Sequence, residues 1–283
     1  MGEMTMDLQR KIDFAINLLR NIPQDGPIEI CYSGGKDSDV ILDLAKWAGI
    51  PDDAIYKNTT IDPPGTLAHC REKGVRVVQP KRSFYQLVEL WGLPNRWRRF
   101  CCVELKEYKI HDRAVIGIRR SESAARAKRY TEPEVCRVYK NGSKVRQYFP
   151  ILEWTDADVA EYIALRGIKC HPLYYDADGA FHVERRLGCL GCPLSIKDAI
   201  ADYKQYPSVL KATLRAMKRR KEQRPCEAWH RNFGGDIYAA MYFQLFAKTL
   251  EEFKATTTSE LFPEMNLDYK KHLEDYFGID LTV

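Results

Sequence analysis

The stretch from Ile28 to Ala48, IEICYSGGKDSDVILDLAKWA, decides the fold of this chain. It begins with a short apolar run typical of a β-strand and breaks at two adjacent glycines. It then continues with apolar residues at helical spacing. A strand, a glycine turn and a helix start gather backbone N–H groups around one point, where the helix dipole is positive. The stretch therefore predicts an anion-binding loop between a strand and a helix.

The side chains of this loop suit a phosphate ligand. Its glycines can take φ > 0 and let a phosphate approach the backbone, and Lys36 adds a positive charge. Asp37 or Asp39 is expected to hold Mg²⁺ against phosphate oxygens. The spacing differs from the G-x-x-x-x-G-K-[ST] loop of kinases and GTPases. The predicted nucleotide-binding residues of the loop are Ser33, Gly34, Gly35, Lys36, Asp37 and Ser38.

Composition and cysteine usage narrow the class of protein. The chain has 283 residues, a net charge of +5 and 45% hydrophobic residues, which fits one large domain or a domain with an appendage. No apolar run approaches the roughly 18 residues of a membrane span, and the N-terminus lacks the apolar segment of a secretory signal. Nine cysteines without an export signal favour thiol or metal chemistry in a reducing compartment. We expect a cytoplasmic protein that does not bind membranes.

Strand and helix patterns alternate along the first part of the chain, which predicts an α/β fold with a doubly wound, mostly parallel sheet. The expected strands are 28–32, 54–60, 75–80 and 114–118, and the expected helices are 7–22, 36–48, 66–73 and 83–92. A β-hairpin turning at Asn141 and Gly142 follows, and then a helix from a cap at Thr155 to Gly167.

From Ser195 onward the sequence indicates helices at about 196–222, 235–254 and 268–277 and no strand. We therefore predict a nucleotide-binding domain at 1–195 and a helical C-terminal extension at 196–283. The basic segment 211–225 is either a phosphate-backbone contact or a solvated helix end. The aromatic residues of the tail are interpreted as helix–helix packing; they are Tyr238, Tyr242, Phe243 and Phe246.

Four motifs follow one another in the order known from one family. They are SGGKDS at 33–38, a strand leading into IDPP at 61–64, GIRRSESAAR at 117–126, and FPILEWTDADVAEYI through HPLYY to RRLGCLGCP at 149–193. From about residue 25 to 195 the chain resembles the phosphoadenosine phosphosulfate (PAPS) reductase family of PP-loop ATP pyrophosphatases. The resemblance implies the adenine nucleotide alpha hydrolase-like fold and a bound adenine nucleotide, either ATP or a sulfonucleotide.

The resemblance also extends the site beyond the loop. It implies that Arg119 and Arg120 lie near the phosphate or sulfate end of the nucleotide. The predicted catalytic residues are Lys36, Asp37, Arg119 and Arg120, and the additional nucleotide-binding residues are Asp62, Gly117 and Arg126.

Four cysteines are spaced for a metal centre. Cys101 and Cys102 are adjacent, and Cys189 and Cys192 form a C-x-x-C. On spacing alone, a tetrahedral zinc and an iron–sulfur cluster both fit. The pattern is similar to that of bacterial and plant adenylylsulfate reductases, a resemblance that implies a [4Fe–4S] cluster on these four thiolates. Cys31 and Cys136 are instead expected to be small buried hydrophobic residues.

One departure from the family bears on the reaction. Reductases of this family attack sulfur with a cysteine in a C-terminal Glu-Cys-Gly-Leu-His type motif, whereas after Cys192 this chain has only Cys226. We therefore favour an ATP pyrophosphatase of sulfurtransferase type that adenylates an acceptor, as in nucleic-acid thiolation or phosphorothioation, with a cysteine desulfurase as partner. One alternative is an adenylylsulfate or phosphoadenylylsulfate reductase that depends on a thiol reductant. A second is a nucleotide-binding sensor module.

Overall fold

The computed structural model describes residues 5–139, 141–257 and 267–283, which form two compact units. The first unit, here called the sheet unit, comprises residues 1–58, 63–80 and 105–188. The second, here called the helical unit, comprises residues 59–62, 81–104 and 189–283.

The sheet unit is built on six strands in the order β3-β2-β1-β4-β6-β5. The strands are β1 Ile28–Tyr32, β2 Asp52–Lys57, β3 Arg76–Val78, β4 Arg113–Ile116, β5 Glu134–Val138 and β6 Lys144–Tyr148. All neighbours pair in parallel except β5, which pairs with β6 as an antiparallel edge strand. The predicted α/β class, the mostly parallel sheet and the hairpin are thus confirmed.

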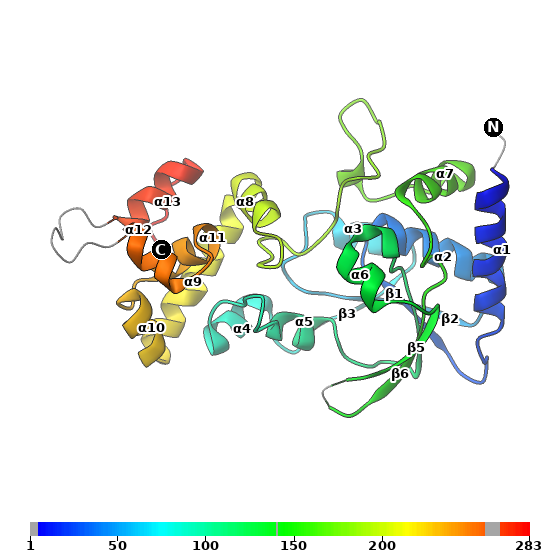
Figure 1. Ribbon diagram of the computed structural model, residues 1–283, viewed down its shortest axis with the longest axis horizontal. Helices are drawn as coiled ribbons and strands as arrows, with labels where there is room; N and C mark the ends of the chain where they lie inside the picture. Colours follow the sequence, from blue (N-terminus) through cyan, green and yellow to red (C-terminus); the bar gives the residue numbers. More distant parts are fainter. Residues whose placement is uncertain (1–4, 140, 258–266) are drawn as a thin grey trace. The chain divides into compact units, whose positions relative to one another are not determined.

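Helices bury one face of the central strands. The helices of this unit are α1 Met6–Arg20, α2 Lys36–Ala48, α3 Thr66–Glu72, α6 Ala124–Arg129 and α7 Asp156–Arg166. Helix α2 packs against both α1 and α7 (Figure 1). Ile28 and Ile30 of β1 enter the same apolar core as residues of all three helices. Because alternate side chains of a strand face opposite ways, Glu29 and Cys31 lie on the other face of β1. That face of β1 therefore carries a carboxylate and a thiol.

Local signals explain the helix ends. The hydroxyl of Thr155 accepts from the N–H of Asp158, and the Asp158 carboxylate accepts from the N–H of Thr155 at 2.6 Å. This is the predicted capping arrangement with aspartate in place of glutamate. Helix α7 ends at Gly167, also as predicted.

The edge position of β5 overturns one expectation. Cys136 was expected to be buried, but it is exposed. A hairpin strand that ends the sheet has no neighbour to cover it, and the sequence does not reveal which hairpin strand is at the edge.

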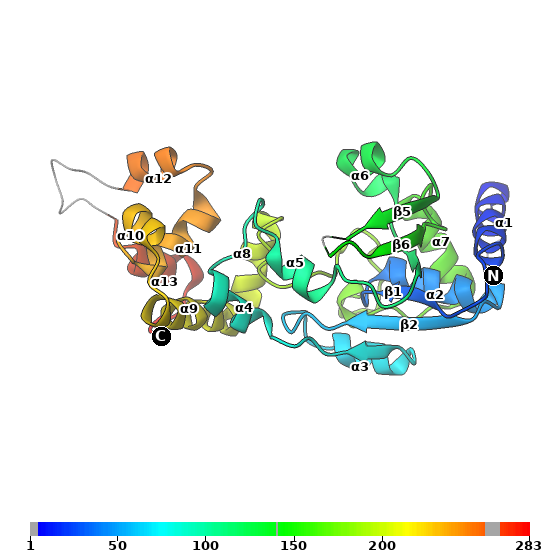
Figure 2. The ribbon, with the colours of Figure 1, turned by 90° about the horizontal axis from the view of Figure 1, so that it is seen from below.

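The helical unit contains no strand in the described part of residues 189–283, as predicted. Its helices are α4 Phe84–Trp91, most of α5 Phe100–Leu105, α8 Ile196–Gln205, α9 Pro207–Gln223, α10 Glu227–Phe233, α11 Ile237–Phe246, α12 Leu250–Thr257 and α13 Tyr269–Phe277. Figure 2 shows these helices from a second direction. Among the described residues, no helix has both the length and the apolar character needed to cross a membrane.

Two of the expected long helices are each divided in two. The segment 196–222 is interrupted at Tyr206, because Pro207 lacks a backbone N–H and starts a new helix instead of continuing the old one. The segment 235–254 is interrupted after Phe246. Helix α4 packs against α9, which is why residues 81–104 cluster with the C-terminal helices. The two units therefore divide the chain differently from the expected boundary at 195/196.

The aromatic residues of the tail pack against one another. The ring of Tyr242 lies 5.1 Å from that of Phe246, and the ring of Phe243 lies 5.8 Å from that of Phe253. The hydroxyl of Tyr238 donates to the carbonyl of Leu281 at 2.8 Å. The interpretation of these residues as helix packing is confirmed.

Candidate functional site

The glycine loop between β1 and α2 has the conformation that its residues predict. Gly34 takes φ 81°, a left-handed conformation, and a Cβ there would lie 3.0 Å from Cγ2 of Thr66. A side chain at this position would thus be strained both by the backbone and by its neighbour. Gly35 has an ordinary φ of −83° and serves as the N-cap of α2. The hydroxyl of Ser38 donates to the Gly35 carbonyl at 2.6 Å, which holds the loop against the helix.

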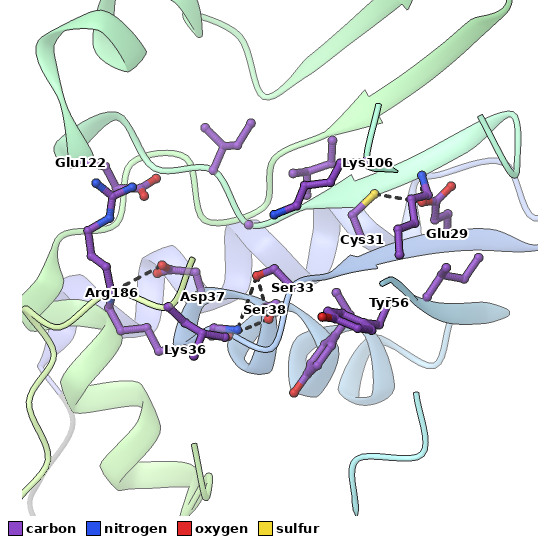
Figure 3. A pocket seen from close by; sticks show the side chains of 18 of the residues that line it. Glu29, Cys31, Ser33, Lys36, Asp37, Ser38, Tyr56, Lys106, Glu122 and Arg186 are labelled. Carbon is purple, nitrogen blue, oxygen red and sulfur yellow. Dashed lines mark hydrogen bonds and ion pairs between the residues drawn. The ribbon is translucent and has the colours of Figure 1, made fainter. Parts of the chain in front are cut away.

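A cavity of about 310 Å³ opens at this loop (Figure 3). Its lining includes the loop residues Ser33, Gly35, Lys36, Asp37 and Ser38, together with Gly117 and Tyr174. Five basic and three acidic side chains line it; they are Lys36, Lys57, Lys106, Arg126 and Arg186, and Glu29, Asp37 and Glu122. The cavity therefore has an excess of positive charge beside the positive end of a helix, which suits a phosphorylated ligand.

Lys36 is held in place at the start of α2. Only 5% of the residue is exposed, and its Nζ lies 3.5 Å from Oδ2 of Asp37 and 5.6 Å from the ring centre of Tyr174. Burial, more than any other cause, raises the pKa of the Tyr174 hydroxyl, so that it remains protonated. The ammonium group thus has a carboxylate and an aromatic face as its neighbours.

Arg119 lies behind Asp37. Its Nε donates to Oδ1 of Asp37 at 2.7 Å, and its NH2 donates to Oδ1 of Asp156 at 2.7 Å. Burial opposes the charge of the guanidinium, but the two carboxylates outweigh it and raise the pKa of Arg119. Its side chain is 2% exposed, so Arg119 orients Asp37 and does not itself line the cavity.

Arg120 points elsewhere. Its NH1 donates to Glu153 at 2.8 Å, and both side chains are well exposed. In the described part of the chain, neither Arg119 nor Arg120 is among the residues that line the cavity. Their expected place near the phosphate or sulfate end of a bound nucleotide remains a prediction.

Arg126 is the predicted arginine that does line the cavity, where it pairs with Glu122. Three further cations of the lining were not predicted as nucleotide-binding residues: Lys57, Lys106 and Arg186. Lys57 ends strand β2, at the edge of a parallel sheet where ligands collect, and this position could have indicated it.

The polar face of the sheet closes the cavity from one side. Lys57 pairs with the buried Glu29 at 2.8 Å, and Sγ of Cys31 lies 3.3 Å from Oε1 of Glu29. Burial, and then the charge of Glu29, raises the pKa of the Cys31 thiol well above its ordinary value. Cys31 is therefore a protonated thiol and a poor nucleophile.

Of the two aspartates expected to hold Mg²⁺, only Asp37 lines the cavity. Asp39 is buried, accepts from the hydroxyl of Tyr32 at 2.5 Å and lies 3.1 Å from Nε2 of His69. Carboxylate oxygens are the ligands that Mg²⁺ prefers, and Asp37 is the residue that fits this role. Asp62 belongs to the helical unit, where it accepts from the hydroxyl of Thr59 at 2.6 Å.

The four cysteines of the expected metal centre all belong to the helical unit. A hydrogen bond with Cys102, then burial, then the charges of Cys102 and Cys189 raise the pKa of Cys101, so three of the thiols interact. Within the described residues, no three His, Cys, Asp or Glu side chains are arranged to hold a metal ion. Thiols converging from two segments are nevertheless the donor type that iron–sulfur clusters and zinc take. The cluster remains a prediction.

The loop between Cys189 and Cys192 is closely fitted to α8. The N–H of Gly191 donates to Oδ2 of Asp202 at 2.9 Å. Gly191 takes φ 68°, and a Cβ there would lie 2.6 Å from Cζ of Tyr203. Only glycine fits this position, because the backbone is left-handed and the tyrosine ring already occupies the space.

The sequence points to one family. The family model described as the phosphoadenosine phosphosulfate reductase domain matches residues 27–195. The chain belongs to this family. The matched region includes the glycine loop and every residue that lines the cavity.

Individual relatives are more distant. An uncharacterised protein of Methanocaldococcus jannaschii is 29% identical over 208 residues, which cover 68% of this chain and 48% of that protein. Sulfate adenylyltransferase subunit 2 of Geotalea daltonii is 26% identical over 222 residues, 62% of this chain and 70% of that protein. The chain spans about half or less of the length of the first curated relatives that it matches.

Among solved structures, a phosphoadenylyl-sulfate (PAPS) reductase from Candida auris in a phosphate complex aligns with a TM-score of 0.43 at 16% identity. That alignment covers 64% of this chain and 97% of the reductase. FMN adenylyltransferase of Candida glabrata aligns with a TM-score of 0.41 at 18% identity, over 59% of this chain and 58% of the other.

Proposed function

We propose that this protein is an ATP pyrophosphatase that adenylates an acceptor and so prepares it for sulfur transfer. The observation that carries the proposal is the cationic cavity at the Ser33–Ser38 loop, where Lys36, Asp37 and the start of α2 meet. The name of the sulfate adenylyltransferase relative supports adenylyl transfer as the reaction type. The PAPS reductase family supports an adenine nucleotide as the ligand.

In this mechanism the loop binds the β- and γ-phosphates of ATP. Backbone N–H groups at the start of α2 and the ammonium of Lys36 balance their charge. Arg126 and Arg186 line the same cavity and are assigned to the remaining phosphate oxygens. Asp37, held in orientation by Arg119, is the residue that would hold Mg²⁺, which when bound neutralises phosphate charge.

The chemical step is an in-line displacement at the α-phosphorus. An oxygen of the acceptor forms a bond to the α-phosphorus, and the bond from that phosphorus to the bridging oxygen of the β-phosphate breaks. Pyrophosphate leaves with the electron pair of that bond, and an acceptor adenylate remains. The cations of the cavity stabilise the charge that develops on pyrophosphate.

Sulfur transfer would follow from this adenylate. A hydrosulfide, released by a thiol reductant from the persulfide of a cysteine desulfurase, attacks the activated atom, which is a base carbon in thiolation and a backbone phosphorus in phosphorothioation. A C–S or P–S bond forms, the bond from that atom to the adenylate oxygen breaks, and AMP leaves. Cys101, Cys102, Cys189 and Cys192 would hold the [4Fe–4S] cluster, which when bound can carry electrons or an additional sulfur ligand. Nucleic-acid thiolation and phosphorothioation are the processes that fit this chemistry.

A second candidate, a thiol-dependent sulfonucleotide reductase, is favoured by one observation on Cys226. The pKa of the Cys226 thiol is lowered most by the backbone N–H of Trp229. Burial raises this pKa by a smaller amount, and the N–H of Ala228 and the charges of Arg220 and Arg98 lower it further. A lowered pKa is what a nucleophilic thiol requires.

The two candidates are separated by their products. The protein is purified anaerobically and supplied separately with ATP, adenylylsulfate and phosphoadenylylsulfate, with thioredoxin or glutathione as reductant. Sulfate and single-stranded nucleic acid are tested as acceptors with ATP. Pyrophosphate formed from ATP, abolished by Lys36→Ala and not by Lys46→Ala, supports the proposal. Sulfite that depends on Cys226 would establish the reductase instead, and nucleotide binding without turnover would indicate a sensor.

A further inference from the structure

A second cavity, of about 550 Å³, lies entirely within the helical unit. Its walls come from the segment 91–98 and from helices α9, α10 and α11. Three tryptophans line it: Trp91, Trp97 and Trp229. Trp97 is 86% exposed, an unusual state for the largest apolar side chain. An exposed indole at the mouth of a cavity is a surface on which a planar ligand can stack.

The charged groups of this cavity all have the same sign. Arg96, Arg98, Arg220 and Lys248 line it, and no carboxylate does so among the described residues. The first two stand on either side of Trp97 in the sequence, and both are exposed. A ligand of this cavity must therefore supply negative charge beside a planar ring.

A turn in the backbone positions the residues around Trp97. Oδ1 of Asn95 accepts from the N–H of Trp97 at 2.9 Å and from the N–H of Arg98 at 2.8 Å. This side-chain turn fixes the backbone from which the indole and the guanidinium project. On the opposite wall, NH1 of Arg220 donates to the carbonyls of Glu89 and Leu90, which fixes that guanidinium too.

One polar group of the cavity wall has its hydrogen-bonding capacity unused. Nε1 of Trp229 is buried and has no hydrogen-bond partner among the described residues. A buried donor without an acceptor costs free energy, and an oxygen or ring nitrogen of a ligand would remove that cost.

We infer that this cavity binds a nucleotide of a single-stranded nucleic acid, with its base stacked on Trp97 and its phosphates beside Arg96 and Arg98. Aromatic platforms flanked by cations bind single strands in this way. Past Arg220, the end of α9 adds the exposed cations Lys221 and Arg224. One nucleotide does not need so many cations, whereas a strand with several phosphates does.

The inference deepens the proposed function by assigning the acceptor to nucleic acid, and in that respect it rests on it. Tryptophan and arginine are also common at protein interfaces. No carboxylate among the described residues lines the cavity, which favours a polyanion over a mixed protein surface. Binding of an acidic protein segment is the competing possibility that the experiment distinguishes.

The experiment measures binding of a fluorescently labelled 12-nucleotide single-stranded DNA to the full-length protein by anisotropy. Trp97→Ala is expected to weaken binding about five- to a hundredfold, the measured range for loss of one stacked base. Trp97→Phe keeps an aromatic face and should stay within a few-fold of the wild type. The matched control is Trp47→Ala, which removes another exposed tryptophan, from α2 of the sheet unit, and should leave the affinity unchanged.

A second variant tests the electrostatic contacts. Arg98→Ala should reduce the slope of log affinity against log salt by about one, because one phosphate contact is lost. Arg10→Ala removes an exposed arginine of α1 and serves as its control. Thermal melting of each variant verifies that it folds as the wild type does.

Three results would overturn the inference. The first is equal affinity of Trp97→Ala and Trp47→Ala for the 12-mer. The second is binding of AMP or TMP as tight as binding of the 12-mer, which would make the cavity a small-molecule site. The third is equal binding of poly-glutamate, which would show that charge alone, as on an acidic protein segment, is sufficient.

ATP affinity is measured on the same preparations. Absence of oligonucleotide binding by the wild-type protein, with ATP binding retained, defeats this inference alone. Absence of ATP binding with oligonucleotide binding retained defeats the proposed function alone.

Discussion

The two cavities of this protein carry positive charge in different ways. In the sheet unit, Lys57 pairs with Glu29, Arg126 with Glu122, and Lys36 lies near Asp37. In the helical unit, four cations surround the cavity and no carboxylate lines it in the part of the chain that the structure describes. The carboxylates of the first cavity fix its cations in place and offer a metal ligand, which suits a compact phosphate group. The second cavity suits a flat ring and charge spread along a strand.

A cluster in the helical unit would have the largest effect on this comparison of charge between the two cavities. A [4Fe–4S] cluster on the four cysteines carries negative charge and would balance part of the positive charge of Arg96, Arg98 and Arg99. Anaerobically prepared protein is expected to contain about four irons and four sulfides per chain, as a cluster of this type requires. Cys189→Ser should abolish both, and the exposed Cys136→Ser should change neither.

Iron and sulfide are measured colorimetrically after desalting. Stoichiometric zinc without sulfide would contradict the cluster and would favour a structural zinc site.

The stability of the sheet-unit cavity depends on Arg119. Replacing it with methionine leaves the largely buried Asp37 without its guanidinium, and breaking a buried pair costs about 3–5 kcal/mol. We expect the low end, about 3 kcal/mol of unfolding free energy, because Asp156 is largely exposed. Arg120→Met breaks an exposed pair and should cost less than about 1 kcal/mol.

Urea denaturation measures the unfolding free energy of Arg119→Met and of Arg120→Met. Equal losses of stability would mean that Arg119 does not hold Asp37 in the way the hydrogen bonds indicate.

Lys36 tests the assignment of the first cavity to phosphate. Lys36→Ala removes a charge-assisted contact of roughly 1.5–3 kcal/mol, about a ten- to hundredfold loss of ATP affinity. Lys46→Ala, at the exposed end of the same helix, should have no effect. Calorimetric titration with a non-hydrolysable ATP analogue measures both, and wild-type affinity in Lys36→Ala would refute the site.

The smallest expected effect is on the thiol of the second cavity. Because nearby N–H groups and arginines stabilise its thiolate, Cys226 should react with iodoacetamide with a midpoint below the ordinary thiol pKa of 9.0. Alkylation of the Cys226 peptide is followed with mass spectrometry across a range of pH. A midpoint for Cys226 at or above the ordinary thiol pKa would contradict the lowered pKa.

The local parts of the fold could be predicted because their causes are local. The strand, Gly34 and the helix start follow one another in the sequence, and so do Thr155 and Asp158 of the helix cap. The order of strands and the alternation of helices then limit the topology to few choices. For this reason the sheet and its glycine loop agree with the sequence interpretation.

The parts that could not be predicted depend on contacts between distant residues. Arg119 and Asp37 are 82 positions apart, and nothing in GIRRSESAAR indicates that the first arginine faces a carboxylate. Trp97 and Trp229 line one cavity although they lie far apart in the sequence. Exposure of Cys136 depends on the position of β5 at the end of the sheet. Periodicity identifies elements but does not show which side chains meet between them.

The fit of Gly191 against Tyr203 has an evolutionary consequence. Because a Cβ at 191 would overlap the tyrosine ring, the two positions cannot change independently. Among homologous chains, a residue other than glycine at position 191 should occur only where a small side chain replaces the tyrosine at position 203 of α8. The residue at position 191 of this C-x-x-C would then vary together with the residue at position 203 of α8.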